Sequence, residues 1–294
     1  MIDPGTTIGA VHLTIADLRR SIRFYESHLG FIVHRTGDRT AWLGAGGPDL
    51  LILTQDASAP RVPGTTGLYH FAILVPSRAD LSRAMRRLVQ TNTTMQGAAD
   101  HGVSEALYLA DPDDNGIEIY RDRPRPEWPI VDGHLHMGVA PLDLDALRSE
   151  AGDEQNRAGL ARGTVIGHVH LHVSRIDVAN AFYVGVLGFE VMQRYGPSAL
   201  FVSAGGYHHH IAVNTWAGVG APPPPAGAIG LRYFEVRLPN DAALAAVAGR
   251  LEEAGVTGEA VDGGLLVRDP ASNSILLTTL HQHQGHDGHK DQIP

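Results

Sequence analysis

Six side chains with metal-binding or acid–base chemistry lie in two separated stretches of this 294-residue chain. They are His70, His101, Tyr108 and Glu118 in the first stretch, and His168 and His209 in the second. Together they supply two histidines and one carboxylate for a metal ion, and three further groups that can hydrogen-bond or move protons. Two histidines and one carboxylate, with coordination positions left open, are the ligand set of non-haem Fe(II) oxygenases. Since neither stretch holds the complete set, the fold must bring the two stretches together.

The composition restricts the class of protein. Hydrophobic residues make up 43% of the chain and charged residues 19%, as in soluble globular proteins. The formal net charge of −9 argues against a nucleic-acid partner, because phosphate binding needs a basic surface. No apolar run reaches the length of a membrane span, and the first residues lack the features of a secretory signal. The absence of Cys excludes thiolate ligands and fits a reducing cytoplasm, so we expect a cytoplasmic protein with no membrane partner.

The chain repeats itself. Ile8-Gly9 recurs as Ile166-Gly167, and Asp111-Pro112 recurs as Asp269-Pro270, both at an offset of 158 residues. This indicates a tandem duplication. Each half divides again into an alternating apolar strand, a helical stretch and three short strands. The pattern therefore predicts an α+β fold of four βαβββ modules, near residues 8–54, 68–121, 166–214 and 230–280.

The modules define the expected domains. An N-terminal domain holds modules one and two over residues 1–121, and a C-terminal domain holds modules three and four over residues 164–280. The Pro-rich start of residues 122–163 indicates a linker, with a short helix expected over residues 142–150. His134 and His136 in this linker are interpreted as surface or packing residues. The polar, His-rich tail over residues 281–294 has no apolar periodicity and is expected to be disordered.

The segment DHGVSEALYLADPDDNGIE, from Asp100 to Glu118, contains a His, a Tyr, a Pro-containing turn and a Glu. With the four modules, this pattern resembles the vicinal oxygen chelate superfamily of glyoxalases, bleomycin resistance proteins and dioxygenases. Within it the chain is similar to the extradiol catechol 2,3-dioxygenases, which implies two cupped mixed sheets that form half-barrels. Ala99 and Asp114 depart from the family pattern. Asp114 replaces a usual Gly or Pro, but Asp tolerates the left-handed geometry of a turn.

The resemblance implies that His168, His70 and Glu118 bind the metal. Glu118 lies in the apolar run GIEIY, where an unpaired carboxylate would be costly, so pairing or metal binding is expected. Module one has Ala10 at the place of His168, and its His12 falls two residues further along the strand. Two residues span about 6–7 Å along a strand, roughly three times a metal–ligand bond. His168 therefore fits better, and a site of His12, His70 and Glu118 is the alternative.

The other modules lack ligands at the matching positions. Module four has Tyr233 where module two has His70, and Leu276 where module two has Glu118. The complete set therefore requires module two to pair with module three. Two alternatives are that the modules pair in sequence order, one with two and three with four, or that they pair between the subunits of a dimer.

By the same resemblance the metal is Fe(II), with Mn(II) as an alternative, and the substrates are a small aromatic diol and O₂. Tyr108 would hydrogen-bond an oxygen of the diol, and His101 would orient the substrate or move a proton. His209 is expected on the last strand of module three, facing the cavity, as the acid/base residue of O–O cleavage. The ring would open beside the vicinal diol. A homo-oligomer is expected, since this is common in the superfamily.

Other functions use the same scaffold. A glyoxalase-type metal-dependent isomerase or lyase relies on a second carboxylate, whereas module three offers histidines at that place. A drug-binding resistance protein needs no metal triad, so the complete ligand set argues against this function. A hydroquinone-type dioxygenase uses the same ligand types, so this alternative to the extradiol dioxygenase stays open.

Overall fold

The computed structural model of this chain describes residues 1–150 and 159–279. Each half contains two βαβββ modules. Module one comprises β1 (Thr7–Ile15), α1 (Leu18–Phe24) with a π-helical turn at Tyr25–Leu29, β2 (Ile32–Thr36), β3 (Thr40–Gly44) and β4 (Asp49–Gln55). Module two comprises β5 (Gly67–Leu74), α2 (Arg78–Gln90), β6 (Met95–Asp100), β7 (Ser104–Ala110) and β8 (Gly116–Asp122).

The second half repeats this order. Module three comprises β12 (Val165–His172), α4 (Ile176–Asn180) with a π-helical turn at Ala181–Val186, β13 (Glu190–Tyr195), β14 (Ala199–Ser203) and β15 (Ile211–Asn214). Module four comprises β16 (Gly230–Leu238), α5 (Asp241–Glu253), β17 (Glu259–Val261), β18 (Gly264–Arg268) and β19 (Ser274–Thr279). The segment between the halves contains a 3₁₀ turn at Arg125–Glu127, β9 (Ile130–Val131), β10 (His134–Leu135), β11 (Ala140–Pro141) and α3 (Leu144–Glu150).

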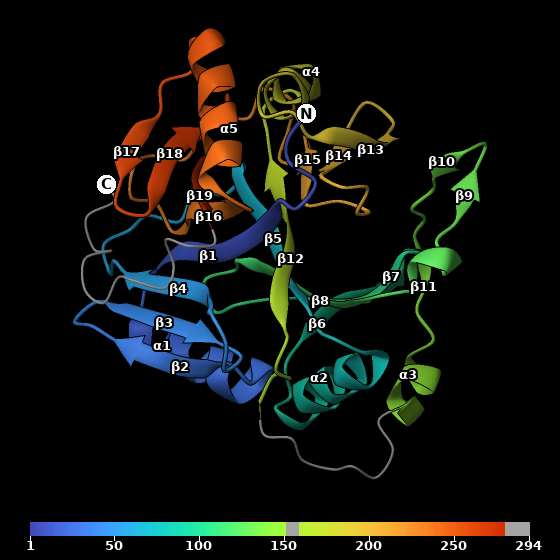
Figure 1. The fold of residues 1–294 in the computed structure, drawn as a ribbon. Helices are drawn as coiled ribbons and strands as arrows, with labels where there is room; N and C mark the ends of the chain where they lie inside the picture. Colours follow the sequence, from blue (N-terminus) through green and yellow to red (C-terminus); the bar gives the residue numbers. More distant parts are fainter. Residues whose placement is uncertain (151–158, 280–294) are drawn as a thin grey trace. The chain divides into compact units, whose positions relative to one another are not determined.

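The strands of the described residues form two large curled sheets and a small hairpin of β9 and β10 (Figure 1). The nine-stranded sheet has the order β11-β6-β7-β8-β5-β12-β15-β14-β13, and the eight-stranded sheet has the order β17-β18-β19-β16-β1-β4-β3-β2. Pairing is parallel between β5 and β8, between β12 and β15, and between β16 and β19. The other neighbours in modules two and three pair antiparallel. The predicted α+β fold of four βαβββ modules in mixed sheets is confirmed.

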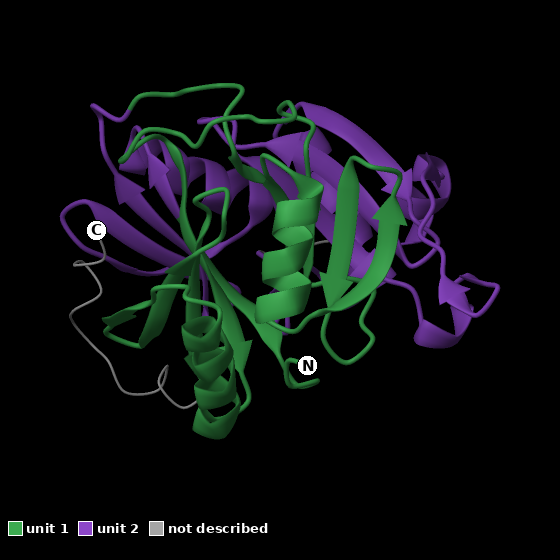
Figure 2. Ribbon diagram, turned by 90° about the horizontal axis from the view of Figure 1, so that it is seen from above, with its two compact units in different colours: residues 1–12, 60–69, 168–294 green, residues 13–59, 70–167 purple. Residues whose placement is uncertain are grey.

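Two compact units can be separated by their internal contacts (Figure 2). Unit 1 comprises residues 1–12, residues 60–69 and the chain from residue 168 onward, and unit 2 comprises residues 13–59 and 70–167. Three of the four boundaries fall inside β1, β5 and β12, and the fourth lies between β4 and β5. The domain boundaries predicted from the repeat follow the sequence halves and stay a prediction. The tail over residues 281–294, predicted to be disordered, lies outside the described residues.

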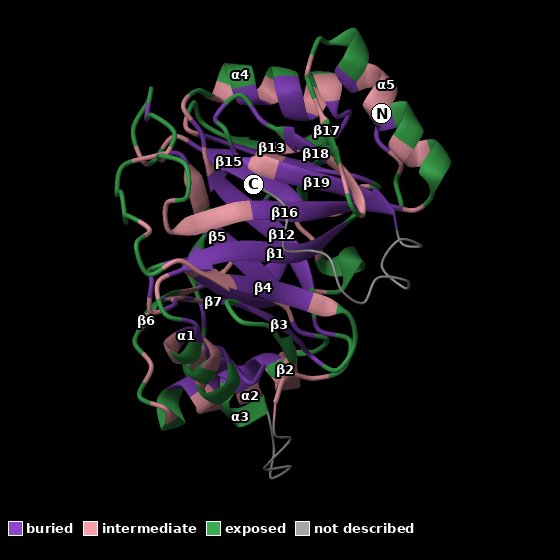
Figure 3. Ribbon diagram, turned by 90° about the vertical axis from the view of Figure 1, so that its left-hand side faces the viewer, coloured by how far each residue is buried: buried purple, intermediate pink, exposed green. Residues whose placement is uncertain are grey.

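Local signals explain the positions of the helices. Helix α2 begins after Ser77, whose side chain accepts a hydrogen bond from the backbone N–H of Asp80. Its buried face includes Leu81, Met85 and Leu88, at the spacing of one helix face, and this helix packs against β8. Figure 3 shows the buried strands of the sheets and the exposed outer face of α5. No helix in the described part of the chain has the length and apolarity needed to cross a membrane.

A buried hydrogen-bonded cluster closes the β7–β8 turn of unit 2. Asp111 accepts a 2.9 Å bond from the hydroxyl of Tyr25 and a 3.0 Å bond from the side-chain amide of Asn115. Burial raises the pKa of Asp111, although these donors oppose the shift. Asp114 in this turn has a φ of 59°, so the expected left-handed conformation is confirmed. Unit 1 repeats the cluster with Tyr183, which bonds Asp269 at 2.8 Å.

Candidate metal centre

His70 and Glu118 lie on neighbouring parallel strands, β5 and β8. The register pairs Phe71 with Ile117 and Ala72 with Glu118, so His70 is diagonal to the carboxylate. His70 Nε2 lies 3.0 Å from Glu118 Oε2, and both residues are buried, Glu118 with 3% of its surface exposed. Two side chains that could hold a metal ion therefore meet inside unit 2, and both belong to the expected ligand set.

Tyr108 and His101 stand beside this pair. Tyr108 is on β7, directly opposite Glu118 in the antiparallel register, which places both side chains on the same sheet face. The Tyr108 ring centre is 5.8 Å from that of His70. His101 follows β6 directly, and its Nε2 lies 2.7 Å from the Tyr108 hydroxyl. The structure thus brings together the four candidate residues of module two.

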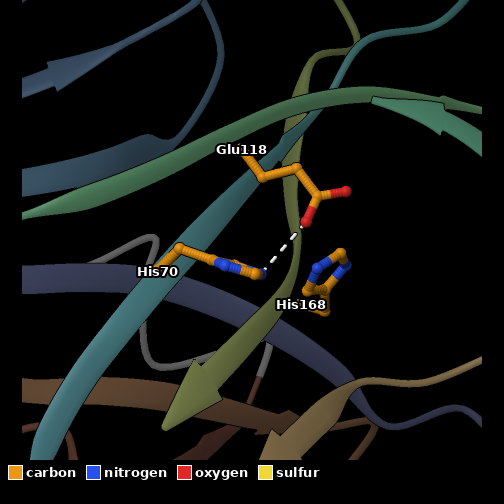
Figure 4. Close-up of side chains that lie close together, drawn as sticks. All are labelled: His70, Glu118 and His168. Carbon is orange, nitrogen blue, oxygen red and sulfur yellow. Dashed lines mark ion pairs between the residues drawn. The ribbon is translucent and has the colours of Figure 1, made fainter. Parts of the chain in front are cut away.

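Gly167, on the first part of β12, lies close to other residues of unit 2. A Cβ atom built on Gly167 would lie 1.8 Å from the Tyr120 hydroxyl and 3.1 Å from Leu74 Cβ, so only glycine fits at this place. His168 is the next residue. One ligand atom from each of His70, Glu118 and His168 lies within 4.8 Å of the others, as the side chains drawn in Figure 4 illustrate. All three residues are buried.

His209 is placed differently from the prediction. It lies in the turn between β14 and β15 and not on β15, although its ring centre is 4.1 Å from that of His168. The alternation expected of a strand fails here, since His208 Nδ1 lies 2.9 Å from His209 Nδ1. The cause is the turn at Gly205 and Gly206, whose φ angles are 60° and 67°. The pair of glycines before the histidines was the sequence signal for this turn.

His12, the alternative ligand, belongs to a different cluster in unit 1. Its ring packs edge-on against Tyr233 at 4.9 Å. Tyr233, Leu266 and Leu276 form a buried apolar cluster, and burial raises the pKa of the Tyr233 hydroxyl. The positions in module four that match His70 and Glu118 are therefore filled by packing residues. The metal-ligand group found in the described residues contains His168 and does not contain His12.

Asn214 is a residue of this region that the sequence analysis missed. The Trp216 backbone N–H donates to Asn214 Oδ1 at 2.9 Å, which fixes the orientation of the amide. Asn214 Nδ2 then donates to His170 Nε2 at 2.9 Å, and His172 Nδ1 donates to Asn214 Oδ1 at 2.8 Å. Phe201 and Trp216 both pack against the His170 ring, with ring centres 5.9 and 5.2 Å away. His170 and His172 are thus held by Asn214 and are not part of the ligand group found here.

The donor set suits a divalent transition metal. Two imidazole nitrogens and one carboxylate oxygen approach one another in a buried place, where an isolated carboxylate would be costly. Imidazole and carboxylate ligands of this number are used for Fe(II), and they also suit Mn(II). The residues present therefore fit a metal centre of this kind.

The chain belongs to the Glyoxalase/Bleomycin resistance protein/Dioxygenase superfamily, whose family model matches residues 7–119 and 165–273. The two matches correspond to the two halves of the repeat. The chain is 48% identical over 280 residues to a catechol-2,3-dioxygenase of Bacillus subtilis (strain 168), covering 94% of this chain and 98% of that protein. It is 33% identical over 100 residues to a biphenyl-2,3-diol 1,2-dioxygenase of Rhodococcus globerulus, covering 33% of this chain and 48% of that protein.

Solved structures share the fold. A putative dioxygenase from Bacillus subtilis subsp. subtilis str. 168 superposes with a TM-score of 0.63 at 15% identity, over 93% of this chain and 85% of that one. Glyoxalase I from Zea mays superposes with a TM-score of 0.58 at 15% identity, over 96% of this chain and 98% of that one. At these identities the likeness concerns the fold alone, because the same fold carries different activities.

Proposed function

We propose that this chain is an extradiol ring-cleaving dioxygenase, which inserts both atoms of O₂ into a catechol next to its vicinal diol. The observation that carries the proposal is the 48% identity to a catechol-2,3-dioxygenase over nearly the whole chain. The buried group of two histidines and one carboxylate supports it, since oxygenases with such ligands leave positions open for substrates.

His168, His70 and Glu118 are the proposed metal ligands. The metal we propose is Fe(II), and Mn(II) suits the same donors. When bound, the metal would act as a Lewis acid toward the hydroxyl groups of the diol and hold both substrates together. The proximity of the three ligand atoms and the order β8-β5-β12 in one sheet support a site built by modules two and three.

Three further residues have proposed roles in hydrogen bonding to the substrates or in moving protons. Tyr108 lies beside His70, so its hydroxyl can bond an oxygen of the diol. His101, in contact with that hydroxyl, can take up and return a proton at Nε2. His209 lies against His168, and we assign it the proton exchanged with the oxygen substrate.

The test is anaerobic reconstitution with Fe(II), followed by catechol and O₂, with oxygen uptake and the appearance of a yellow product recorded. Wild-type protein and the His12→Ala variant should take up oxygen and form the yellow product. The variants His70→Ala, His168→Ala and Glu118→Ala should do neither. If His12→Ala lost oxygen uptake and His168→Ala retained it, the chain would still be a ring-cleaving dioxygenase, but His168 would not be one of its metal ligands.

Substrate choice separates the remaining alternatives. Turnover of a hydroquinone but not of a catechol would identify the hydroquinone-type dioxygenase. Isomerase or lyase activity with bound metal and without oxygen uptake would identify the glyoxalase-type enzyme. We also propose a homo-oligomer located in the cytoplasm, and light scattering should then give a mass that is a multiple of 31.4 kDa.

A further inference from the structure

The segment between the two halves holds His101 at two points. The Gly138 backbone N–H donates to the His101 carbonyl oxygen at 3.1 Å. In return, His101 Nδ1 lies 2.7 Å from the Gly138 carbonyl oxygen. Just beyond Gly138, β11 pairs antiparallel with β6, with Ala140 opposite Asp100. Residues 138–141 therefore extend the sheet edge beside His101, although the sequence indicated only a linker there.

This contact determines which nitrogen of His101 carries the proton. A backbone carbonyl oxygen can only accept, so the Nδ1 atom that faces Gly138 must be the protonated one. In a neutral imidazole Nε2 is then bare and accepts a hydrogen bond. The group 2.7 Å from Nε2 is the Tyr108 hydroxyl, which therefore donates its proton to His101.

The direction of this hydrogen bond decides what Tyr108 can do for a substrate. Its proton points to His101, so its oxygen is oriented to accept a hydrogen bond from another group. Tyr108 lies opposite Glu118 and beside His70, next to two of the proposed metal ligands. A hydroxyl of the diol can thus pass its proton to Tyr108 while Tyr108 passes its own to His101 Nε2. The diol loses one proton, Tyr108 is unchanged and His101 becomes the imidazolium.

We infer that residues 138–141 are a positioning segment of the catalytic site, in which the Gly138 carbonyl fixes His101 as the Nδ1–H tautomer that can accept the Tyr108 proton. The catalytic part of this inference rests on the proposed function, whereas the tautomer does not. The opposite tautomer would place an N–H against the Tyr108 hydroxyl and reverse its direction, and His101 could not then take a proton at Nε2.

The chain offers a matched pair of variants at Gly138. A Cβ added there meets nothing within 4 Å, so Gly138→Ala should keep both contacts. Gly138→Pro removes the N–H that bonds the His101 carbonyl, and the proline ring occupies the space of that hydrogen. The segment must then move away from His101, and its carbonyl moves with it.

The first measurement is the tautomer of His101 by nitrogen NMR on the full-length chain labelled with ¹⁵N-histidine, with and without Zn(II), a diamagnetic substitute for iron. The His101 signals are those missing from the His101→Gln variant. Wild type and Gly138→Ala should show a protonated Nδ1 and a bare Nε2, and Gly138→Pro should show a mixture of tautomers. A protonated Nε2 in wild type, or an unchanged tautomer in a folded Gly138→Pro, overturns the inference.

The second measurement separates positioning from a general loss of structure. We expect kcat for catechol to fall by roughly 10- to 100-fold in Gly138→Pro, with KM little changed and metal content retained. In the double variant with His101→Gln, Gly138→Pro should cause no further loss, because it acts through His101. Additive losses would contradict the positioning role. If no variant or wild type cleaves catechol, the proposed function fails, while the NMR result still decides the tautomer.

Discussion

Tyr120 fills the space where a side chain of residue 167 would lie, and this explains why glycine precedes His168. The Tyr120 hydroxyl would be 1.8 Å from a Cβ on Gly167. The matching Gly9 of module one is equally crowded, since a Cβ there would lie 2.5 Å from Glu235 Oε2. Both copies of the repeat need a bare backbone at the start of this strand, although their neighbours differ. The Gly167 backbone thus lies close to the Tyr120 side chain, one residue before His168.

Gly167→Ala should therefore weaken both the fold and the metal site. Forcing an extra methyl group into a packed place typically costs about 1–3 kcal/mol. The shift of β12 should also move His168, so metal content should fall after reconstitution. Thermal unfolding and metal analysis test this, with Gly185→Ala as the control, because a Cβ at Gly185 meets nothing within 4 Å. Adding Tyr120→Phe should restore part of the loss, and wild-type behaviour of Gly167→Ala alone would refute the contact.

His209→Ala should lower turnover without emptying the metal site. The ring lies against His168 and is not in the ligand group, so metal content should stay at the wild-type level. Loss of one acid/base residue typically costs about 100-fold or more in rate. Steady-state oxygen uptake with metal analysis on the same samples measures both quantities. A metal-depleted His209→Ala would show instead that this residue is needed to hold the metal.

At the scale of secondary-structure elements, local sequence patterns predicted the elements whose signals lie within a short segment of the chain. Helix α2, over residues 78–90, is the helical stretch that the module pattern predicted, because its cap and its apolar face both depend on the local sequence. The linker helix was expected over residues 142–150 and begins at Leu144. Strand β11 was missed, because two residues carry no periodicity and pair only through β6, which is distant in sequence. His209 was predicted to lie on a strand because the two glycines before it were not interpreted as the signal for a turn.

The Tyr–Asp clusters join a helix of one module to a turn of the next, within each unit. Tyr25→Phe should destabilise unit 2, because the buried Asp111 carboxyl loses a donor that water cannot replace. A buried group left short of a partner typically costs about 1–3 kcal/mol. Tyr183→Phe should cost a similar amount in unit 1. Denaturant unfolding measures this, with Tyr195→Phe as the control, since Tyr195 is 56% exposed. Equal stability of all three variants would contradict the role of the clusters.

The same cluster predicts a pH dependence. Burial raises the pKa of Asp111 above its usual value of 3.8, so the folded protein binds this proton more tightly than the unfolded chain. The contribution of Asp111 to stability is fully present below pH 3.8 and is lost as the pH rises through the raised pKa. The unfolding temperature of wild type relative to Asp111→Asn should therefore fall as the pH rises through this range and then level off. A difference that grows with pH would show that the pKa is lowered instead.

Asp177 supplies a control of opposite sign. The hydrogen bond from Arg175 lowers the pKa of this exposed carboxyl. Its contribution is present above its usual pKa and is lost as the pH falls through the lowered value. The stability of wild type relative to Asp177→Asn should thus rise with rising pH, and only by a small amount, because an exposed ion pair contributes little. Comparing the two variants separates burial from a general effect of pH on the chain.

For the whole molecule, the repeat revealed the duplication but not the order of strands in the sheets. The neighbouring first strands lie far apart in the sequence, about one hundred residues for β5 and β12 and more than two hundred for β1 and β16, so no local pattern predicts their pairing. The chemistry was easier to predict than the topology, because the two copies differ at the ligand positions. His70 and Glu118 in module two correspond to Tyr233 and Leu276 in module four, and only the first pair can bind a metal. The asymmetry of the copies therefore identified the candidate site.

This asymmetry predicts one metal ion per chain, although the chain carries two copies of the scaffold. At the second copy, the Ala10 N–H donates to Glu235 Oε2 at 3.0 Å, and Arg237 bonds the same oxygen at 2.7 Å, so the buried carboxylate there already has cationic and N–H partners. Metal analysis after reconstitution should give about one equivalent, and Glu118→Gln should remove it. An ion that binds only the folded chain at 100 times its Kd adds about 2.7 kcal/mol to stability. Chelation should therefore lower the unfolding temperature of wild type and leave that of Glu118→Gln unchanged. Two equivalents of metal per chain, or an equal effect of chelation on both proteins, would show that the second copy still binds metal.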